Sequence, residues 1–207
     1  MADDAPHEYR ALDRETVYEG RIISLYRERV AMPGGGDSVR DIVRHPGAVA
    51  VVAIDEQDRV VLVRQYRHAF GEHLWELPAG LCDADGEPPA DTARRELAEE
   101  VQLAAARWSE LATSYSSPGF SDEVVLVYLA EELTDAERPE GFVVQHEEAD
   151  MTVERVPLAD AVQWVFDGRI RNSSAIVGVL AAAQARSGGV RLRPADGDRG
   201  PVTTSQG

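Results

Sequence analysis

Short runs of β-branched and other apolar residues, bounded by turn-forming residues, fill most of the first 80 positions. Runs of this length and composition are typical of β-strands. The first three surround a glycine-rich turn at 32–37, which indicates a small antiparallel unit that buries little by itself. The next two are more uniformly apolar and are predicted to be buried strands around a turn at 55–58. The predicted strands of this part are 16–18, 21–30, 38–44, 48–54, 60–65 and 74–77.

A helix is predicted from the proline pair at 88–89 onward. Proline suits the first turn of a helix because its missing N–H would have no partner there. Ala93, Leu97 and Val101 then form an apolar stripe at helical spacing. The rest of the chain predicts strands at 108–114, 124–130 and 151–156 and helices at 158–166 and 173–185, the last capped by Asn172 or Ser173.

Composition places the chain among ordinary globular proteins. It has 207 residues, 43% of them hydrophobic, which is enough for one sizeable core. No apolar run approaches the ~18 residues that a membrane span needs, and the acidic N-terminus lacks the features of a signal peptide. The single cysteine, Cys82, excludes an intrachain disulfide framework and fits a reducing compartment, so a cytoplasmic location is expected.

The formal charge of −16 limits the partners of this protein. Nucleic acids and anionic membranes require a basic surface, so neither is an expected partner. A phosphate-bearing ligand would be repelled by the molecule as a whole. Local positive charge, from bound metal ions and a few arginines, would have to hold it.

The segment Arg95-Glu96-Leu97-Ala98-Glu99-Glu100 carries the strongest chemical signal. On a helix, Glu96 and Glu100 lie on one face beside the apolar stripe, while Glu99 and Arg95 are projected further toward solvent. Like charges at this spacing repel, and a bound cation would compensate them. Carboxylate oxygens favour a hard divalent ion, Mg²⁺ or Mn²⁺. The alternative is a solvated acidic helix face without a ligand.

The wider pattern resembles the Nudix hydrolases. Their motif is Gly, a five-residue gap, Glu, a seven-residue gap, and then Arg-Glu-aliphatic-any-Glu-Glu-any-Gly-aliphatic. Two departures occur: the first gap holds six residues, and Gln102 replaces the late glycine. Neither removes a carboxylate, so catalysis is expected to survive both. The matching positions are Gly80, Glu87, Arg95, Glu96, Leu97, Glu99, Glu100 and Leu103.

Within that family, Leu77-Pro78-Ala79-Gly80 and Pro118 resemble the ADP-ribose pyrophosphatase branch. The resemblance implies an α/β/α sandwich with a mixed sheet, preceded by a small antiparallel β unit that serves for homodimerisation. The domains expected are the N-terminal unit at 1–45, the Nudix domain at 46–186 and a flexible tail at 187–207. The activity it implies is Mg²⁺-dependent hydrolysis of ADP-ribose to AMP and ribose 5-phosphate, with Mn²⁺ as an alternative ion.

The same resemblance assigns roles to individual residues. The metal ligands would be Glu96, Glu99, Glu100 and the carbonyl of Ala79, with Arg95 holding a glutamate in place. The general base would come from a later loop, at Glu148 or alternatively at Glu147. The expected substrate contacts are Arg40 (donated across a dimer), Arg67, Gly80, Leu81, Ser117 and Glu123.

Three other functions remain open at this stage. The substrate of the hydrolase could be another nucleoside diphosphate conjugate, such as a nucleotide sugar or a dinucleotide. A module that senses ADP-ribose without cleaving it would tolerate loss of the motif carboxylates, which this chain retains. An acidic interaction protein without a small-molecule site is the third. Catalysis by Cys82 is disfavoured because the sequence indicates no histidine partner.

Overall fold

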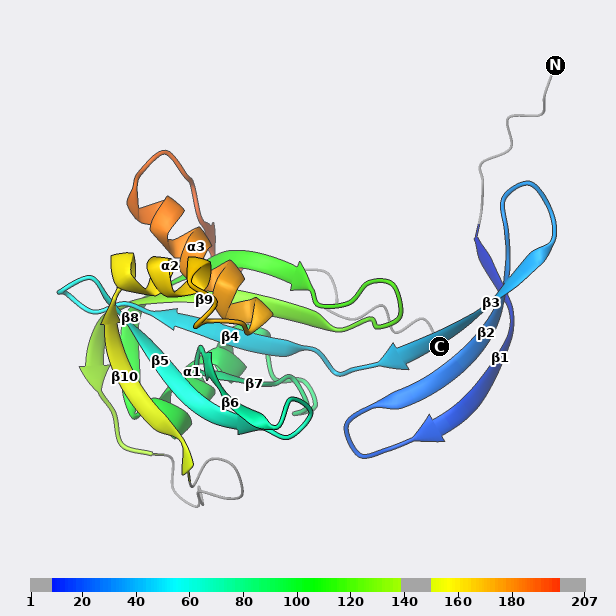
Figure 1. Cartoon of the computed structure of the whole chain (residues 1–207), viewed down its shortest axis with the longest axis horizontal. Coiled ribbons are helices and arrows are strands. Elements are labelled where there is room, and N and C mark those ends of the chain that lie inside the picture. The colour runs from blue at the N-terminus through cyan, green and yellow to red at the C-terminus, as the bar shows by residue number, and fades with distance from the viewer. Residues whose placement is uncertain (1–8, 139–149, 198–207) are drawn as a thin grey trace. The chain divides into compact units, whose positions relative to one another are not determined.

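The computed structural model of the chain describes residues 9–138 and 150–197 (Figure 1). The chain divides into two compact units, which are described separately. Among the described residues, the first unit comprises 9–46 and 115–124, and the second comprises 47–114 and 125–197. No helix in these described ranges is both long and apolar enough to cross a membrane.

The first unit is a three-stranded antiparallel sheet in the order β1-β2-β3, as the sequence predicts. Every residue of the edge strand β1 is exposed. The loop 115–124 joins the end of β3, where Val43 N–H donates to the carbonyl of Phe120 (2.7 Å) and Asp122 N–H to that of Val43 (3.1 Å). The strands are β1 (Arg10–Glu19), β2 (Ser24–Ala31) and β3 (Asp37–Arg44).

The second unit contains two sheets. The five-stranded sheet has the order β11-β8-β9-β4-β7 and is mixed, because β4 and β9 run parallel while β7 and β11 pair antiparallel. The three-stranded sheet β10-β5-β6 is antiparallel throughout. The strands are β4 (Ala48–Ala53), β5 (Arg59–Arg67), β6 (Glu72–Glu76), β7 (Ala79–Leu81), β8 (Leu103–Tyr115), β9 (Val124–Asp135), β10 (Thr152–Pro157) and β11 (Arg193–Pro194).

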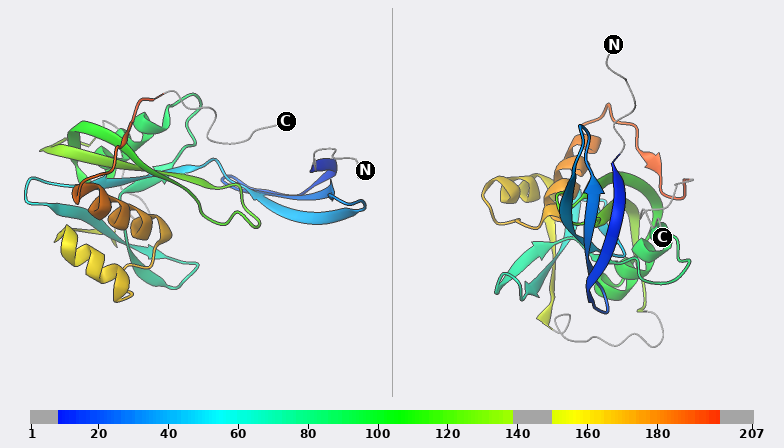
Figure 2. Two further views of the ribbon diagram at one scale, coloured as in Figure 1. Left: turned by 90° about the horizontal axis from the view of Figure 1, so that it is seen from above. Right: turned by 90° about the vertical axis from the view of Figure 1, so that its right-hand side faces the viewer.

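Helices cover both sides of the strands in the second unit. Figures 1 and 2 show α1 (Pro89–Val101) on one side, with α2 (Leu158–Phe166) and α3 (Ser173–Arg186) on the other. The predicted α/β/α sandwich with a mixed sheet is therefore confirmed. A glycine lets α3 approach the strands closely: a Cβ at Gly178 would lie 2.6 Å from Leu77 Cδ1 and 2.8 Å from Val52 Cγ2.

The described part of the predicted tail, residues 187–197, contacts the rest of the second unit at several points. The short strand β11 pairs with β8, and Ala195 is buried. Asp196 accepts hydrogen bonds from Arg94 of α1 at 2.9 and 3.1 Å. These contacts come from residues distant in sequence, so the local composition of the segment, rich in Gly and Arg, gives no sign of them.

Candidate active site

The helix α1, which contains most of the motif, is bounded by Pro88 and Gln102. Pro88 precedes it in an extended conformation, and its carbonyl accepts the N–H groups of Asp91 (2.8 Å) and Thr92 (3.1 Å). At the other end Gln102 adopts a left-handed conformation (φ 55°), and its N–H bonds the carbonyls of Ala98 and Leu97. Glycine adopts this conformation most easily, so Gln102 keeps the C-terminal turn at a cost of ~1–2 kcal/mol.

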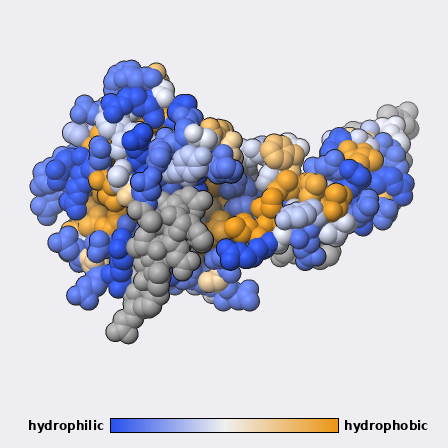
Figure 3. All heavy atoms as spheres, turned by 60° about the horizontal axis from the view of Figure 1, so that its bottom comes forward, coloured by the Kyte–Doolittle hydropathy of each residue, from blue (hydrophilic) through white to orange (hydrophobic). Residues whose placement is uncertain are grey.

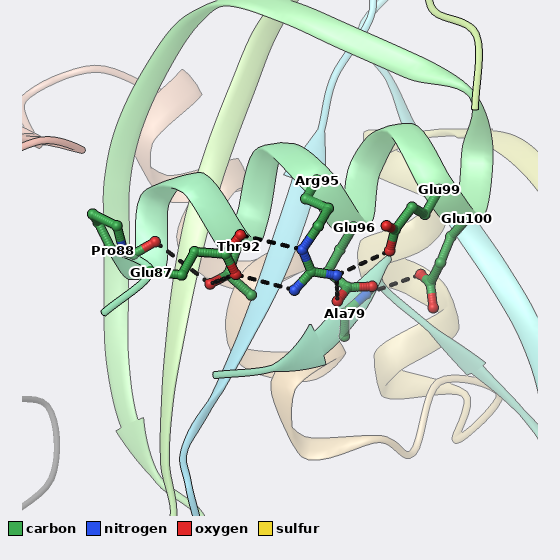
Figure 4. Close-up of polar contacts among 8 residues, drawn as sticks. All are labelled: Ala79, Glu87, Pro88, Thr92, Arg95, Glu96, Glu99 and Glu100. Carbon is green, nitrogen blue, oxygen red and sulfur yellow. Dashed lines mark hydrogen bonds and ion pairs between the residues drawn. The ribbon is translucent and has the colours of Figure 1, made fainter. Parts of the chain in front are cut away.

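The strand β7 lies directly against α1 at the acidic positions (Figure 4). Glu100 Oε2 accepts the N–H of Ala79 at 3.0 Å. The carboxyl group of Glu96 occupies the space that a side chain at Gly80 would need, because a Cβ there would lie 2.1 Å from its Cδ and Oε1. Glycine at position 80 is therefore required for close approach rather than for turn geometry.

Arg95 lies at the centre of the carboxylates of this site (Figure 4). Its Nη1 donates to Glu96 Oε1 at 2.7 Å and to Glu99 Oε2 at 2.9 Å. Its Nε and Nη2 donate to the two carboxylate oxygens of Glu87 at 3.3 and 3.1 Å. One guanidinium group thus connects three acidic side chains by charge-assisted hydrogen bonds.

The expectation that Glu99 is projected further toward solvent than Glu96 is wrong. The side chains of Glu96 and Glu99 are 13% and 14% exposed. A helical projection ranks positions by angle alone, whereas Arg95 draws the Glu99 carboxylate toward that of Glu96. Three side chains of the predicted site, those of Arg95, Glu96 and Glu99, are therefore in contact.

The pKa values of two acidic side chains of the site are shifted in opposite directions. Burial raises the pKa of Glu96 to about 7, and nearby Glu99 adds to this, while Arg95 opposes it. The hydrogen bonds from Arg95 lower the pKa of Glu87. Burial opposes this, and the hydrogen bond from the hydroxyl of Thr92 adds a smaller lowering. Of these two carboxylates, that of Glu96 has the less compensated negative charge.

The thiol of Cys82, in the motif loop, has little reactivity near neutral pH. Burial raises the pKa of Cys82 to about 11, and the negative charges of Glu87 and Asp83 act in the same direction. The thiolate is the reactive form of cysteine, so its population near neutral pH is very small. This agrees with the prediction that Cys82 is not a nucleophile.

Comparison with known proteins decides the family, because the model of the NUDIX domain matches residues 44–175. The chain belongs to the Nudix family. It is 50% identical over 192 residues to the ADP-ribose pyrophosphatase of Mycobacterium tuberculosis. The matched residues cover 93% of this chain and 91% of that protein. The ADP-ribose pyrophosphatase of Bacillus subtilis is 39% identical over 158 residues, with 76% and 83% covered.

These relatives confirm the resemblance to the ADP-ribose pyrophosphatase branch and the prediction that this Nudix protein is a hydrolase. The methanol dehydrogenase activator of Bacillus methanolicus is also similar, at 36% identity over 172 residues, with 83% and 91% covered. A solved structure of an ADP compounds hydrolase superposes with a TM-score of 0.75 over 89% of this chain and 97% of that chain. Its identity is only 21%, so it supports the fold alone.

The residues of this Nudix site fit a divalent cation, which Nudix hydrolases generally use. Carboxylate oxygens are the ligands that Mg²⁺ and Mn²⁺ prefer. A cation beside Glu96 would also compensate the charge that burial disfavours. Within residues 9–138 and 150–197, no three acidic, histidine or cysteine side chains already surround a common point, since Arg95 lies between Glu96 and Glu99. The carboxylates that would hold an ion are therefore close together, but they must turn from Arg95 toward it.

A further ion pair stands beside the Nudix motif. Arg67, at the end of β5, donates from Nε and Nη2 to the two oxygens of Glu76 at 2.8 and 2.6 Å. The side chain of Glu76 is 3% exposed. Sequence reasoning missed Glu76, although its position two residues after buried Leu74 in β6 indicates an inward-facing acid. Since Glu76 is three residues before Ala79, the pair ties Arg67 to the segment that reaches α1.

The remaining predicted residues of the site are distributed over both units. Gly80 and Leu81 belong to β7 of the second unit, where Leu81 pairs with Ala48. In the first unit, Arg40 of β3 donates to the hydroxyl of Ser38. The carbonyl of Ser117 accepts the N–H groups of Phe120 and Ser121. Oε1 of Glu123 lies 3.9 Å from Nε2 of His45. Glu147 and Glu148, the predicted bases, lie outside the described residues.

Proposed function

We propose that this Nudix hydrolase cleaves the diphosphate bond of ADP-ribose and releases AMP and ribose 5-phosphate. The observation that carries the proposal is the packing of Glu96 and Glu100 of α1 against Ala79 and Gly80 of β7. The similarity to two ADP-ribose pyrophosphatases, at 50% and 39% identity, supports the choice of substrate.

The proposed metal ligands are Glu96, Glu99, Glu100 and the carbonyl of Ala79, with Mg²⁺ as the ion and Mn²⁺ as its replacement. When bound, such ions neutralise the diphosphate and polarise its oxygens. Arg95 orients the carboxylates, because its hydrogen bonds limit the rotamers of Glu96 and Glu99.

The protein's remaining proposed tasks are to bind the substrate and to move one proton. The water oxygen attacks one phosphorus, the bridging oxygen leaves with the other phosphate, and the proton of the water passes to Glu148 or Glu147. Arg67 donates to a substrate phosphate, and its bidentate pair with Glu76 keeps the guanidinium oriented. Gly80 and Leu81 border the nucleoside.

We further propose that Arg40, Ser117 and Glu123 contact the substrate, and that the protein is a homodimer formed through the N-terminal strands, across which Arg40 is donated. Figure 3 displays apolar surface among the polar surface of this sheet, and β1 is an exposed edge strand. Such edges and patches favour pairing with a second chain. The exposed apolar residues of the first unit include Leu12, Val17, Tyr18, Ile22, Ile23 and Val39.

Light scattering coupled to size exclusion tests the dimer. The mass expected is twice the 22.6 kDa of one chain. Replacement of an exposed β1 residue, Val17→Asp, is expected to yield the monomer because the charge would be buried in the interface. A wild-type monomer at micromolar concentration would contradict this part of the proposal. The domain boundaries (1–45, 46–186 and 187–207) and a cytoplasmic location remain proposals from the sequence.

A substrate panel with product identification tests the activity. ADP-ribose, a nucleotide sugar, a nicotinamide dinucleotide and a flavin dinucleotide are compared by kcat/KM with Mg²⁺, and the reaction in ¹⁸O-water identifies the attacked phosphorus. ADP-ribose is expected to exceed the others by tenfold or more, with AMP and ribose 5-phosphate as products. A preference for another conjugate would replace the substrate, and binding of ADP-ribose without AMP release would favour the sensing module.

A further inference from the structure

A buried hydroxyl group at Thr92, in the first turn of α1, has no role in the motif. Its side chain is fully buried (0% exposed), and Oγ1 donates to Glu87 Oε2 at 2.8 Å (Figure 4). The carbonyl of Pro88 lies 3.4 Å from the same oxygen. A hydroxyl has one proton to donate, so the shorter contact to the carboxylate is its main hydrogen bond.

We propose that Thr92 is a positioning residue for the metal site, because it anchors Glu87, which holds Arg95 in place between Glu96 and Glu99. This inference rests on the proposed function only in that it places the metal ion at the α1 carboxylates. It does not depend on which diphosphate is the substrate.

The anchor is needed because Glu87 belongs to the loop before α1 and not to a strand or helix. This loop has one residue more than the family motif between Gly80 and the glutamate. A tight turn orients its backbone, with Glu87 N–H donating to the carbonyl of Ala84 at 3.1 Å and Gly86 at φ 77°. The turn does not restrict the side-chain torsions of Glu87. The hydroxyl of Thr92, carried by a buried residue of a helix, does so at one oxygen.

Glu87 in turn determines where the guanidinium group of Arg95 lies. Arginine has five N–H donors in a rigid plane. Those of Nε and Nη2 reach Glu87, while Nη1 reaches Glu96 and Glu99. If Glu87 were displaced, it would no longer accept the hydrogen bonds from Nε and Nη2 that hold the guanidinium group. Without that hold, Arg95 would follow Glu96 and Glu99 as they turn toward a cation and would keep competing with it for their oxygens.

The test compares Mn²⁺ binding to the full-length protein without substrate, followed by electron paramagnetic resonance and calorimetry. Thr92→Val removes the hydroxyl with almost no change of volume, and Thr92→Ser retains it. Replacement of a hydrogen-bonded partner behind a metal ligand weakens binding by roughly 10–100-fold. Thr92 acts two steps further out, through Glu87 and Arg95, so a smaller loss of about three- to tenfold is expected for Thr92→Val. Thr92→Ser is expected to retain the wild-type dissociation constant within about twofold.

A matched control and a double variant separate positioning from a general structural effect. Thr113→Val removes a hydroxyl that donates to Glu110 at the same 2.8 Å distance, in β8, and is expected to leave Mn²⁺ affinity unchanged. If Thr92 acts through Glu87, Thr92→Val has no further effect in a Glu87→Gln background. Glu87→Gln alone is expected to weaken Mn²⁺ binding, which keeps the inference testable if Thr92→Val fails to fold.

Any of three results with the variants would overturn the inference: wild-type affinity in folded Thr92→Val, equal weakening in Thr92→Ser, or an undiminished effect in the Glu87→Gln background. A wild-type protein that binds no Mn²⁺ would also overturn it. Failure of the proposed function looks different. In that case Mn²⁺ binds and responds to Thr92 as expected, while ADP-ribose yields no AMP.

Discussion

Adding one methyl group at Gly80 tests the close approach of β7 and α1. In Gly80→Ala the new Cβ would lie 2.1 Å from Cδ and Oε1 of Glu96, whereas ordinary van der Waals contact begins near 3.4 Å. The Glu96 carboxylate must therefore move by about 1.3 Å, the difference of these two distances. The carboxylate can move because the atoms that the new methyl group would crowd are the end of a flexible side chain and not backbone atoms.

Gly80→Ala is expected to reduce catalytic activity. A misplacement of about 1 Å can reduce a rate by roughly a hundredfold. A hundredfold loss of kcat/KM corresponds to about 2.7 kcal/mol of transition-state stabilisation. Stability is expected to change little: the variant weakens one hydrogen bond of Arg95, worth ~1 kcal/mol, and gains ~0.4–1 kcal/mol from the stiffer unfolded chain.

The assay combines AMP release from ADP-ribose under varied Mg²⁺ with thermal unfolding. Gly178→Ala is the matched comparison, because there the new methyl group meets the buried side chains of Leu77 and Val52 instead of a carboxylate. Overpacking costs ~1–3 kcal/mol, so that variant is expected to lose stability while its folded fraction retains activity. Wild-type kcat/KM in Gly80→Ala, or a loss explained by unfolding, would refute the role assigned to Gly80.

Three further predictions concern other contacts of the second unit. Glu76→Gln is expected to raise the KM for ADP-ribose about tenfold at unchanged Mn²⁺ affinity, because it weakens the bidentate pair of the buried Glu76 with Arg67; an unchanged KM would contradict this. Since the pKa of Glu96 is raised to about 7 and only the ionised form binds a cation, Mn²⁺ affinity is expected to increase from pH 6 to pH 8. Calorimetry at both pH values checks this, and a flat profile would be inconsistent with Glu96 as a ligand. Asp55→Asn is expected to cost about 1–3 kcal/mol in urea unfolding without loss of kcat, because Asp55 accepts hydrogen bonds from Gln57 and Arg59 in the β4–β5 turn; a stability equal to wild type would contradict it.

The pH dependence of stability has opposite signs at Glu96 and Asp55. The folded-state pKa of Glu96 lies above its ordinary value of 4.5, so the folded protein binds more protons and loses stability as pH rises from 4.5 to about 7. At Asp55, burial opposes ionisation, but the hydrogen bonds from Arg59 and Gln57 together lower the pKa. Its contribution is therefore complete above pH 3.8 and is lost as pH falls through the lowered pKa.

Sequence patterns were sufficient for features that depend on neighbouring positions or on the family motif. The stripe of Ala93 and Leu97 places α1 correctly, and both residues are fully buried. The motif also aligns Glu87 despite the longer loop, and in the structure Glu87 does contact Arg95. These inferences need only helical geometry and motif spacing.

Contacts between side chains distant in sequence could not be predicted in the same way. The pair of Arg67 and Glu76 joins residues four positions apart in the register of β5 and β6, and β11 depends on an edge of β8 being available. The burial of Glu99 depends on which rotamer Arg95 adopts. Each is decided by tertiary packing, which local periodicity does not specify.

The glycine at position 178 has a consequence beyond core packing. The side chain of Leu77 rests against it, and Leu77 is followed by Pro78, Ala79 and Gly80, which meets Glu96 on the opposite side. Two residues without side chains therefore set how closely α3 and α1 approach the short segment 77–80. Natural variation can adjust the carboxylates little at these contacts, so diversity in substrate choice among such hydrolases is expected to arise in the surrounding loops.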